Sequence, residues 1–381
     1  MKIVVMTVGT RGDVQPYVAL ARGLQRAGHE VLLASASNFA SFVQAAGVPF
    51  YAMRADYYEL INSDEGKAVL KGNPLKLMQT MKQTVFPLMR NLIDDSWNAA
   101  QGADAIVFHP KIIGAAHIGE KLGIPVFPAA TVPLTATRAF PAPGIPNMGP
   151  LFNKLSYSLV AKAASFFDGM IKDWRVQTLG LPAKSQVIDG YQLRTPPAPL
   201  LYCYSPHLLP APADWDASSN HVTGYWTLPD QSNWQPPREF EAFLSAGQPP
   251  VYVGFGSMVA DNPRKVTETV IAAINKAGVR GVIATGWGGM QSSDMPDNVY
   301  LLKEAPHDWL FPRMAAVVHH GGAGTVAAGA ARGKPTVVCP FIADQPFWGR
   351  SHRAAGTRPE IRAAEAAIGR APRRSHPYRS Q

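Results

Sequence analysis

The sequence predicts an α/β protein made of two Rossmann-like domains, each a doubly wound parallel sheet, that face one another across a cleft. Three observations support this fold class. Short apolar runs alternate with helical segments from the start of the chain, the same rhythm begins again near residue 250, and a glycine loop follows the first strand of each half. A length of 381 residues also suits two domains better than one.

The first half opens with a buried strand over residues 2–8, a glycine loop, and a helix over 14–27 with Pro16 in its first turn. The alternation of strands and helices then continues. Further strands are predicted at 30–35, 48–52, 103–108 and 124–128, and further helices at 39–46 and 112–122.

Two longer segments of this half have a less regular pattern. Residues 57–100 are expected to be helical, and their methionines suit a core-facing stripe better than an adaptable pocket wall for an apolar acceptor. Residues 133–150 are rich in proline and glycine. A loop of that length inside a compact domain is usually functional, and we expect it to form part of a lid.

A stretch rich in proline and aromatic residues, 196–237, is expected to hold the last strand of the first half and then a crossover linker. The second half is predicted to contain strands at 250–255, 279–284, 298–302, 314–318 and 334–340, and helices at 262–277 and 326–333. The predicted division is therefore a first domain over 1–225, a linker over 226–245, an incomplete second domain over 246–350, and an atypical basic tail over 351–381 that we expect to be disordered.

The composition excludes several classes of protein. The net charge is +9, but residues 351–381 hold seven Arg and two Glu (7 − 2 = +5), which leaves +4 on the other 350 residues, so no nucleic-acid role is indicated. No apolar run reaches the ~18 residues that span a bilayer. Cys203 and Cys339 are far apart, lack metal-ligand spacing and suit reduced core thiols, which indicates a cytoplasmic protein.

The most informative stretch is the glycine-rich turn from His319 to Thr325, which follows one predicted strand and precedes a helix. Such a turn brings the backbone close to a ligand and aims free N–H groups and the positive end of the helix dipole at it. The Thr325 hydroxyl and the His320 ring add further donors, so a diphosphate is the expected guest. Glycines at this position also occur simply to pack a helix on a sheet.

A second pair of polar residues, Asp344 and Gln345, lies just beyond the next predicted strand. In an open parallel sheet both turns reach the same crevice, and a carboxylate beside a carboxamide suits the hydroxyls of a sugar. The two turns together predict a nucleotide-sugar site. A dinucleotide site is disfavoured, because the first loop has Gly9 and Gly12 without the G-x-G-x-x-G pattern.

The first loop contains one acidic residue, Asp13, at the expected mouth of the first strand. It could cap the following helix or act as a general base, and the residues alone leave both interpretations open. His109, after the fourth strand, is a lesser base candidate, and a structural histidine is the better explanation for it.

The chain resembles the UDP-sugar-dependent glycosyltransferases of the GT-B type over residues 1–350, and most of all the sterol glucosyltransferases and the bacterial glycosyltransferases of antibiotic aglycones. Three motifs in order carry the resemblance: Gly9-Thr10-Arg11-Gly12-Asp13-Val14-Gln15-Pro16, the run from His319 to Thr325, and Asp344-Gln345-Pro346-Phe347-Trp348.

The resemblance implies an inverting, metal-independent transfer of a hexose, with glucose expected, from a UDP-sugar to a hydroxyl of a lipophilic acceptor such as a sterol or a polyketide. No cofactor is implied. Asp13 is implied as the base. The donor-binding residues implied by motif are Thr10, Arg11, Ser257, His307, His320, Ala323, Gly324, Thr325, Asp344 and Gln345.

Two other functions stay open at this point: a catalytically impaired nucleotide-sugar-binding protein, because of the atypical tail, and a sugar-nucleotide epimerase. Uridine and thymidine donors are not distinguished. The enzyme is expected to be a cytoplasmic monomer, and a peripheral membrane contact is one route to a lipophilic acceptor.

Overall fold

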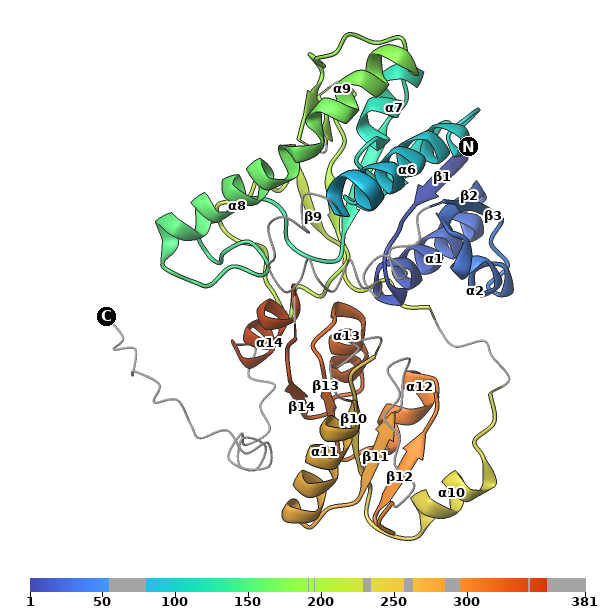
Figure 1. Cartoon of the computed structure of the whole chain (residues 1–381), viewed down its shortest axis with the longest axis vertical. Helices are drawn as coiled ribbons and strands as arrows, with labels where there is room; N and C mark the ends of the chain where they lie inside the picture. Colours follow the sequence, from blue (N-terminus) through green and yellow to red (C-terminus); the bar gives the residue numbers. More distant parts are fainter. Residues whose placement is uncertain are drawn as a thin grey trace. The chain divides into compact units, whose positions relative to one another are not determined.

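The computed structural model describes residues 1–54, 80–190, 192–194, 196–228, 234–256, 263–284, 295–341 and 343–354. The chain divides into two units, Met1–Gln231 (unit 1) and Ser232–Gln381 (unit 2), each built around its own parallel sheet. Figure 1 follows the chain through both units, and each is described here by itself.

The sheet of unit 1 has seven parallel strands in the order β3-β2-β1-β4-β5-β8-β9. Its strands are β1 Lys2–Met6, β2 Glu30–Ala36, β3 Phe50–Met53, β4 Ala105–Phe108, β5 Val126–Ala130, β8 Leu200–Tyr202 and β9 Asn220–Val222. Its described α-helices are α1 Arg11–Arg26, α2 Ala40–Ala45, α6 Phe86–Ala99, α7 Ala115–Leu122, α8 Pro150–Ala164 and α9 Asp168–Gln177. Shorter elements are η1 Ser37–Phe39, η2 Met81–Val85, η3 Ser165–Phe167 and the hairpin of β6 Ile188–Asp189 with β7 Gln192–Leu193.

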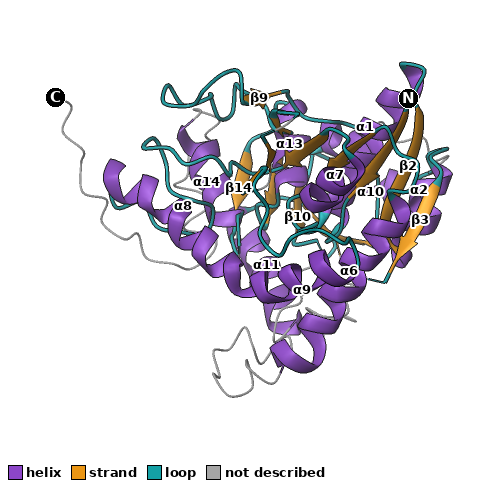
Figure 2. Ribbon diagram, turned by 90° about the horizontal axis from the view of Figure 1, so that it is seen from above, coloured by secondary structure: helices purple, strands orange, loops and turns teal. Residues whose placement is uncertain are grey.

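Side chains of β1 alternate between two hydrophobic clusters, one on each face of the sheet. Val4 and Met6 pack with residues of α6 and α7, whereas Ile3 and Val5 pack with residues of α1. A strand with helices on both faces must be apolar at every position, which explains the uninterrupted run at the start of the chain. Figure 2 shows helices on both sides of these strands.

The sheet of unit 2 has five parallel strands in the order β12-β11-β10-β13-β14. Its strands are β10 Val251–Gly254, β11 Gly281–Ala284, β12 Val299–Leu302, β13 Ala316–His319 and β14 Thr336–Val338. Its described helices are α10 Arg238–Ser245, α11 Pro263–Ala277, α12 His307–Leu310, η4 Phe311–Arg313, α13 Ala323–Ala331 and α14 Gln345–Ala354. The predicted fold class, two Rossmann-like parallel sheets with helices, is confirmed.

Several predicted boundaries need correction. Helix α1 begins at Arg11 rather than at residue 14, because Thr10 caps it and donates its N–H to the Asp13 carboxylate at 2.8 Å. Pro16 consequently lies inside the helix and not in its first turn. Helix α13 likewise begins at Ala323, three residues earlier than predicted.

Some observed elements lie where the sequence predicted none, and some predicted segments lie partly outside the described residues. Helices α8 and α9 follow the proline-rich loop, and β9 lies inside the stretch expected to be mostly linker. Helix α14 extends to Ala354, so the first four residues of the expected tail are helical. Residues 55–79, which belong to the helical segment expected at 57–100, and residues 355–381 of the tail fall outside the described part of the chain.

Candidate active site

Both sheets have one place where the direction of strand addition reverses. In unit 1 the order 3-2-1 turns to 4-5 between β1 and β4, and in unit 2 the corresponding change lies between β10 and β13. At such a switch point the loops after the two strands diverge and leave a crevice at the carboxyl edge of the sheet, where ligands of open α/β proteins bind. The motif residues of both units gather at these two edges.

The switch point of unit 1 holds Asp13, which comes from the first turn of α1. Its Oδ2 accepts hydrogen bonds from the Thr10 N–H at 2.8 Å and the Thr10 hydroxyl at 3.2 Å, and it forms an ion pair with Lys111 Nζ at 3.0 Å. Its Oδ1 has a longer contact, 3.4 Å to Nε2 of His109. Three donors therefore hold Oδ2, while Oδ1 keeps the capacity to accept another hydrogen.

Asp13 is ionised at neutral pH. Burial opposes its charge, but the Lys111 ammonium, the nearby His109 and the Thr10 N–H together hold the pKa of the carboxyl below its usual value of 3.8. The two interpretations of Asp13 are thus compatible in this geometry. One oxygen completes the cap of α1, and the other is a carboxylate oxygen available to a ligand hydroxyl.

His109 follows β4 and is neutral, because burial and then the Lys111 charge lower its pKa from 6.5 to about 3. Its Nδ1 accepts the backbone N–H of Lys111 at 3.1 Å, so the ring proton belongs on Nε2, which faces Asp13. In this tautomer His109 donates towards the carboxylate and holds it. The geometry gives His109 a positioning role beside Asp13.

Lys111 is the residue of this cluster that the sequence analysis did not single out. Arg11, the cation closest to Asp13 in sequence, lies elsewhere: its side chain donates to Gln15 Oε1 at 3.1 Å and lies over the Phe42 ring at 4.9 Å. The cation beside Asp13 is Lys111 instead. Only the pairing of β1 with β4 brings residue 111 to residue 13, so no local pattern indicated the contact.

Gly9 allows the Asp13 carboxylate to lie against the loop backbone. Its φ is +134°, and a Cβ added there would lie 2.2 Å from Asp13 Oδ2. We expect Gly9→Ala to displace the carboxylate and to cost about 1–3 kcal/mol of unfolding free energy, measured by urea denaturation. Gly12→Ala is the matched control, since its nearest atom would be Thr10 Oγ1 at 3.7 Å. Equal stability of the two variants would contradict this account of the loop.

Stability should fall between neutral and acidic pH. Burial lowers the pKa of three histidines in the folded protein, to about 3 for His109 and about 4 for His117 and His320. The unfolded chain, with histidine pKa values of 6.5, binds protons first as the pH falls. The unfolding free energy is therefore highest above pH 6.5 and decreases towards the folded-state values, by about 1.4 kcal/mol per pH unit for each histidine.

Urea denaturation at about pH 7 and about pH 5 measures this slope. His109→Gln removes one of the three protonations, so it should reduce the slope of unfolding free energy against pH by about 1.4 kcal/mol per pH unit. A wild-type stability that stays constant across this range would contradict the buried, neutral state of the three histidines.

The switch point of unit 2 holds the glycine-rich turn. Backbone pairing sets Gly254 of β10 opposite His319 of β13, so the loops after these two strands start side by side. Gly322 is the N-cap of α13, and Ala323, Gly324 and Thr325 form its first turn. The Thr325 N–H donates a hydrogen bond to the Gly322 carbonyl at 3.0 Å. Gly324 is exposed, so the start of this helix is open to a ligand.

His320 lies between two glycines of neighbouring loops. A Cβ on Gly256 would lie 2.9 Å from its Cε1, and a Cβ on Gly322 would lie 2.6 Å from its Nε2, so any side chain at either position would displace the ring. Burial lowers the pKa of His320 to about 4, which makes it a neutral donor or acceptor. His320 is therefore uncharged at neutral pH.

Asp344 and Gln345 lie at the start of α14, beyond β14. Asp344 Oδ2 accepts the Trp348 indole N–H at 3.0 Å, and Gln345 Oε1 accepts the Phe341 N–H at 2.7 Å. Ala343, directly before them, has φ 56° and is the one non-glycine residue with positive φ in the described part of the chain. Backbone strain of this kind is often kept where it fixes functional side chains.

Three further residues, His307, Thr10 and Ser257, were predicted to bind the donor. His307 begins α12 and stacks on the Phe311 ring, with centroids 4.3 Å apart, so its ring has a fixed orientation. Thr10 is the N-cap of α1 beside Asp13. Ser257 lies outside the described residues.

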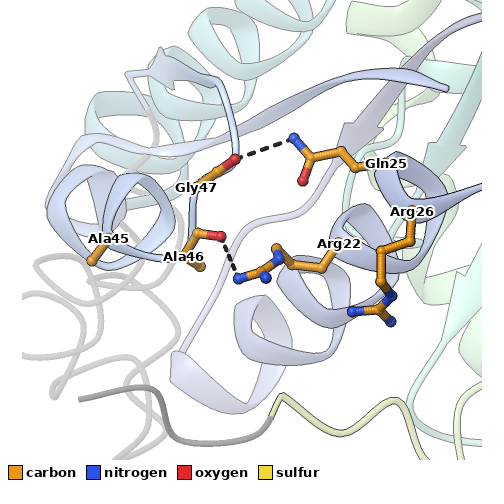
Figure 3. Close-up of a pocket in the computed structure, with 6 residues that line it drawn as sticks. All are labelled: Arg22, Gln25, Arg26, Ala45, Ala46 and Gly47. Atoms are coloured by element: carbon orange, nitrogen blue, oxygen red, sulfur yellow. Dashed lines mark hydrogen bonds between the residues drawn. The ribbon is translucent and has the colours of Figure 1, made fainter. Parts of the chain in front are cut away.

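Figure 3 shows a hollow of unit 1 whose lining includes none of the predicted site residues. It is lined by the second half of α1 and the end of α2, where Arg22 Nη1 donates to the Ala46 carbonyl at 2.8 Å and Gln25 Nε2 to the Gly47 carbonyl at 3.2 Å. These bonds satisfy carbonyls at the end of α2. The hollow is therefore explained by helix capping.

Two Rossmann-like units with these loops at their switch points define the GT-B class of glycosyltransferase. Residues 3–141 match the glycosyltransferase family 28 N-terminal domain, and residues 280–367 match the erythromycin biosynthesis protein CIII-like C-terminal domain. Two stretches of the chain thus match glycosyltransferase domains, and the chain is similar to sterol 3-beta-glucosyltransferases.

A sterol 3-beta-glucosyltransferase of Arabidopsis thaliana is 40% identical over 94% of this chain and 57% of its own length. One from Leptosphaeria maculans is 37% identical over 91% of this chain and 24% of its own length. The chain thus spans little more than half of the first of these relatives and about a quarter of the second.

Solved structures agree on the fold. The kitacinnamycin glycotransferase has a TM-score of 0.69 at 18% identity, covering 96% of this chain and 89% of that one. The calicheamicin glycosyltransferase CalG4 has a TM-score of 0.62 at 19% identity, covering 93% and 83%.

Proposed function

We propose that this protein transfers a hexose, with glucose as the first choice, from a UDP-sugar to the hydroxyl of a sterol-like lipophilic acceptor. The observation that carries the proposal is the pair of switch points, one with an ionised aspartate and the other with an open helix start. The relatives named sterol 3-beta-glucosyltransferases support glucose as the transferred sugar and a sterol as the acceptor.

In the proposed reaction the acceptor hydroxyl approaches Asp13 Oδ1, the oxygen with the single long contact. The oxygen of the acceptor hydroxyl attacks the anomeric carbon of the donor, and the proton of that hydroxyl passes to the Asp13 carboxylate. At the same time the bond from the anomeric carbon to the UDP oxygen breaks. A single displacement of this kind inverts the anomeric centre. Lys111 and His109 hold the carboxylate in place throughout.

The leaving diphosphate gathers negative charge as this bond breaks. The backbone N–H groups of Ala323 and Gly324 and the positive end of α13 are aimed where such charge would develop, and the neutral His320 ring can donate to it. Asp344 and Gln345 would face the sugar hydroxyls, with Thr10, Arg11, Thr325 and His307 as further donor contacts.

We expect full activity in the presence of excess chelator, because the helix start and main-chain amides replace a divalent cation as the counter-charge. The measurement is product formation with and without EDTA. Activity that disappears with EDTA and returns with Mg²⁺ would contradict a metal-independent reaction.

A product screen by mass spectrometry, with several UDP- and dTDP-sugars against sterol, polyketide and flavonoid alcohols, tests the proposed function. Transfer to a sterol from UDP-glucose is the expected result. Donor binding without turnover would identify a nucleotide-sugar-binding protein, and isomerised donor without acceptor would identify an epimerase; either outcome overturns the proposal.

A monomeric, cytoplasmic state and a peripheral membrane contact remain predictions from the sequence. Among the residues that the structure describes, every helix is too short or too polar to cross a bilayer.

A further inference from the structure

Helix α8 buries two polar side chains and exposes a row of leucines. Asn153 and Ser156 are 2% and 0% exposed. The Asn153 amide donates to the Arg138 carbonyl at 3.2 Å, and Ser156 Oγ accepts the Ala142 N–H at 2.8 Å. These bonds tie α8 to the proline-rich loop that precedes it. The helix thus buries Asn153 and Ser156 beside Tyr157 and leaves its leucines in solvent, whereas an ordinary surface helix buries its leucines.

The outer face of α8 carries three leucines at intervals of four residues. Leu151, Leu155 and Leu159 are 78%, 54% and 50% exposed, and this spacing aligns them along one side of the helix. Met148, just before the helix, and Val160 extend the same exposed set. In Figures 1 and 2 this helix lies at the periphery of unit 1. A row of exposed apolar side chains along one side of a helix is a candidate interaction surface.

The charge on α8 is of one sign. Its sequence, Pro150–Ala164, contains Lys154 and Lys162, both exposed, and no acidic residue. Lys154 follows the exposed Leu151 along the helix, and Lys162 follows the exposed Val160. Their long side chains can therefore extend past the leucines to a charged surface. Apolar side chains bordered by lysines on a convex helix are typical of proteins that bind the interface of an anionic membrane.

We propose that the α8 face, defined as Met148, Leu151, Leu155, Leu159 and Val160 with Lys154 and Lys162, docks on an anionic lipid surface. The leucines enter the boundary between headgroups and acyl chains, and the lysines contact the anionic headgroups. This docking rests on the proposed function, in which the acceptor is lipophilic. Such an acceptor dissolves in the membrane, so an enzyme bound to the membrane surface meets it there. Its test, however, needs neither donor nor acceptor.

The test is co-sedimentation of the full chain with vesicles of phosphatidylcholine alone or mixed with phosphatidylserine. We expect binding to the mixed vesicles and weaker binding to the neutral ones. Leu155→Gln with Leu159→Gln should weaken binding to mixed vesicles by about tenfold or more. Lys154→Glu with Lys162→Glu should remove the preference for phosphatidylserine. Val176→Gln is the matched control, because Val176 is 52% exposed but lies on α9.

Three outcomes would overturn the proposal: no sedimentation of the wild-type chain with mixed vesicles, equal binding of the leucine variant, or an equal loss in the Val176 control. Light scattering of the same samples identifies the main competitor. If the leucine variant changes the oligomeric state and leaves vesicle binding unaltered, the α8 face contacts a second copy instead. Turnover of a detergent-dispersed acceptor should be the same in wild type and the leucine variant, which separates a failed membrane site from a failed enzyme.

Discussion

Asp13→Asn is expected to lower turnover by about a hundredfold or more, the usual scale for the loss of a general base. Asparagine keeps the shape of the side chain, and its amide oxygen can still accept the Thr10 N–H that Oδ2 accepts in the wild type, at 2.8 Å. What disappears is the carboxylate charge and the basicity of Oδ1. The measurement is kcat with donor and acceptor both saturating.

Two controls separate this loss from damage to the fold. Urea denaturation reports the stability lost with the Lys111 ion pair, which holds Asp13 at 3.0 Å. Calorimetric titration with UDP measures the affinity of the proposed donor site in unit 2, and this affinity should equal that of the wild type. Asp13→Ala, which also removes the cap, should be as inactive and less stable. Near-normal turnover in the asparagine variant would remove Asp13 from the role of base.

Gly324→Asp is expected to weaken UDP binding by about a hundredfold and yet to stabilise unit 2. Gly324 is exposed in the first turn of α13. A carboxylate there interacts favourably with the helix dipole by about 0.3–1 kcal/mol, and aspartate is a better helix former than glycine. The same charge repels a diphosphate at the helix start, and a hundredfold loss corresponds to about 2.7 kcal/mol.

Gly324→Asn is the matched control, because it has nearly the same size without the charge. Its UDP affinity should lie much closer to the wild-type value than that of the aspartate variant. Equal losses in the two variants would show that bulk, not charge, matters at this position. Unchanged affinity in both would place the diphosphate elsewhere.

The sheets could be predicted because their strands are buried on both faces. The run Ile3–Met6 is apolar throughout, and the glycine loops after it and after β13 indicate where strand gives way to helix. Helix α8 was missed for the opposite reason. It buries the polar Asn153 and Ser156 together with Tyr157 and exposes three leucines, so the ordinary pattern of burial fails there.

The candidate site was predictable where its residues are neighbours in sequence. The turn from His319 to Thr325 and the pair Asp344 and Gln345 stand at carboxyl ends of strands, as their local patterns indicated. Lys111 was missed because its contact with Asp13 depends on which strands pair. The tautomer of His109 depends on a backbone N–H two residues away, which only the geometry of the loop reveals.

The anomeric configuration of the product tests the central claim most directly. If Asp13 takes the proton of the attacking hydroxyl while UDP leaves from the other face, an α-linked UDP-glucose must give a β-linked glucoside of the sterol. Proton NMR of the purified product distinguishes the two linkages. A β-glucoside is the result we predict. An α-glucoside would require a different mechanism and would contradict the role assigned to Asp13.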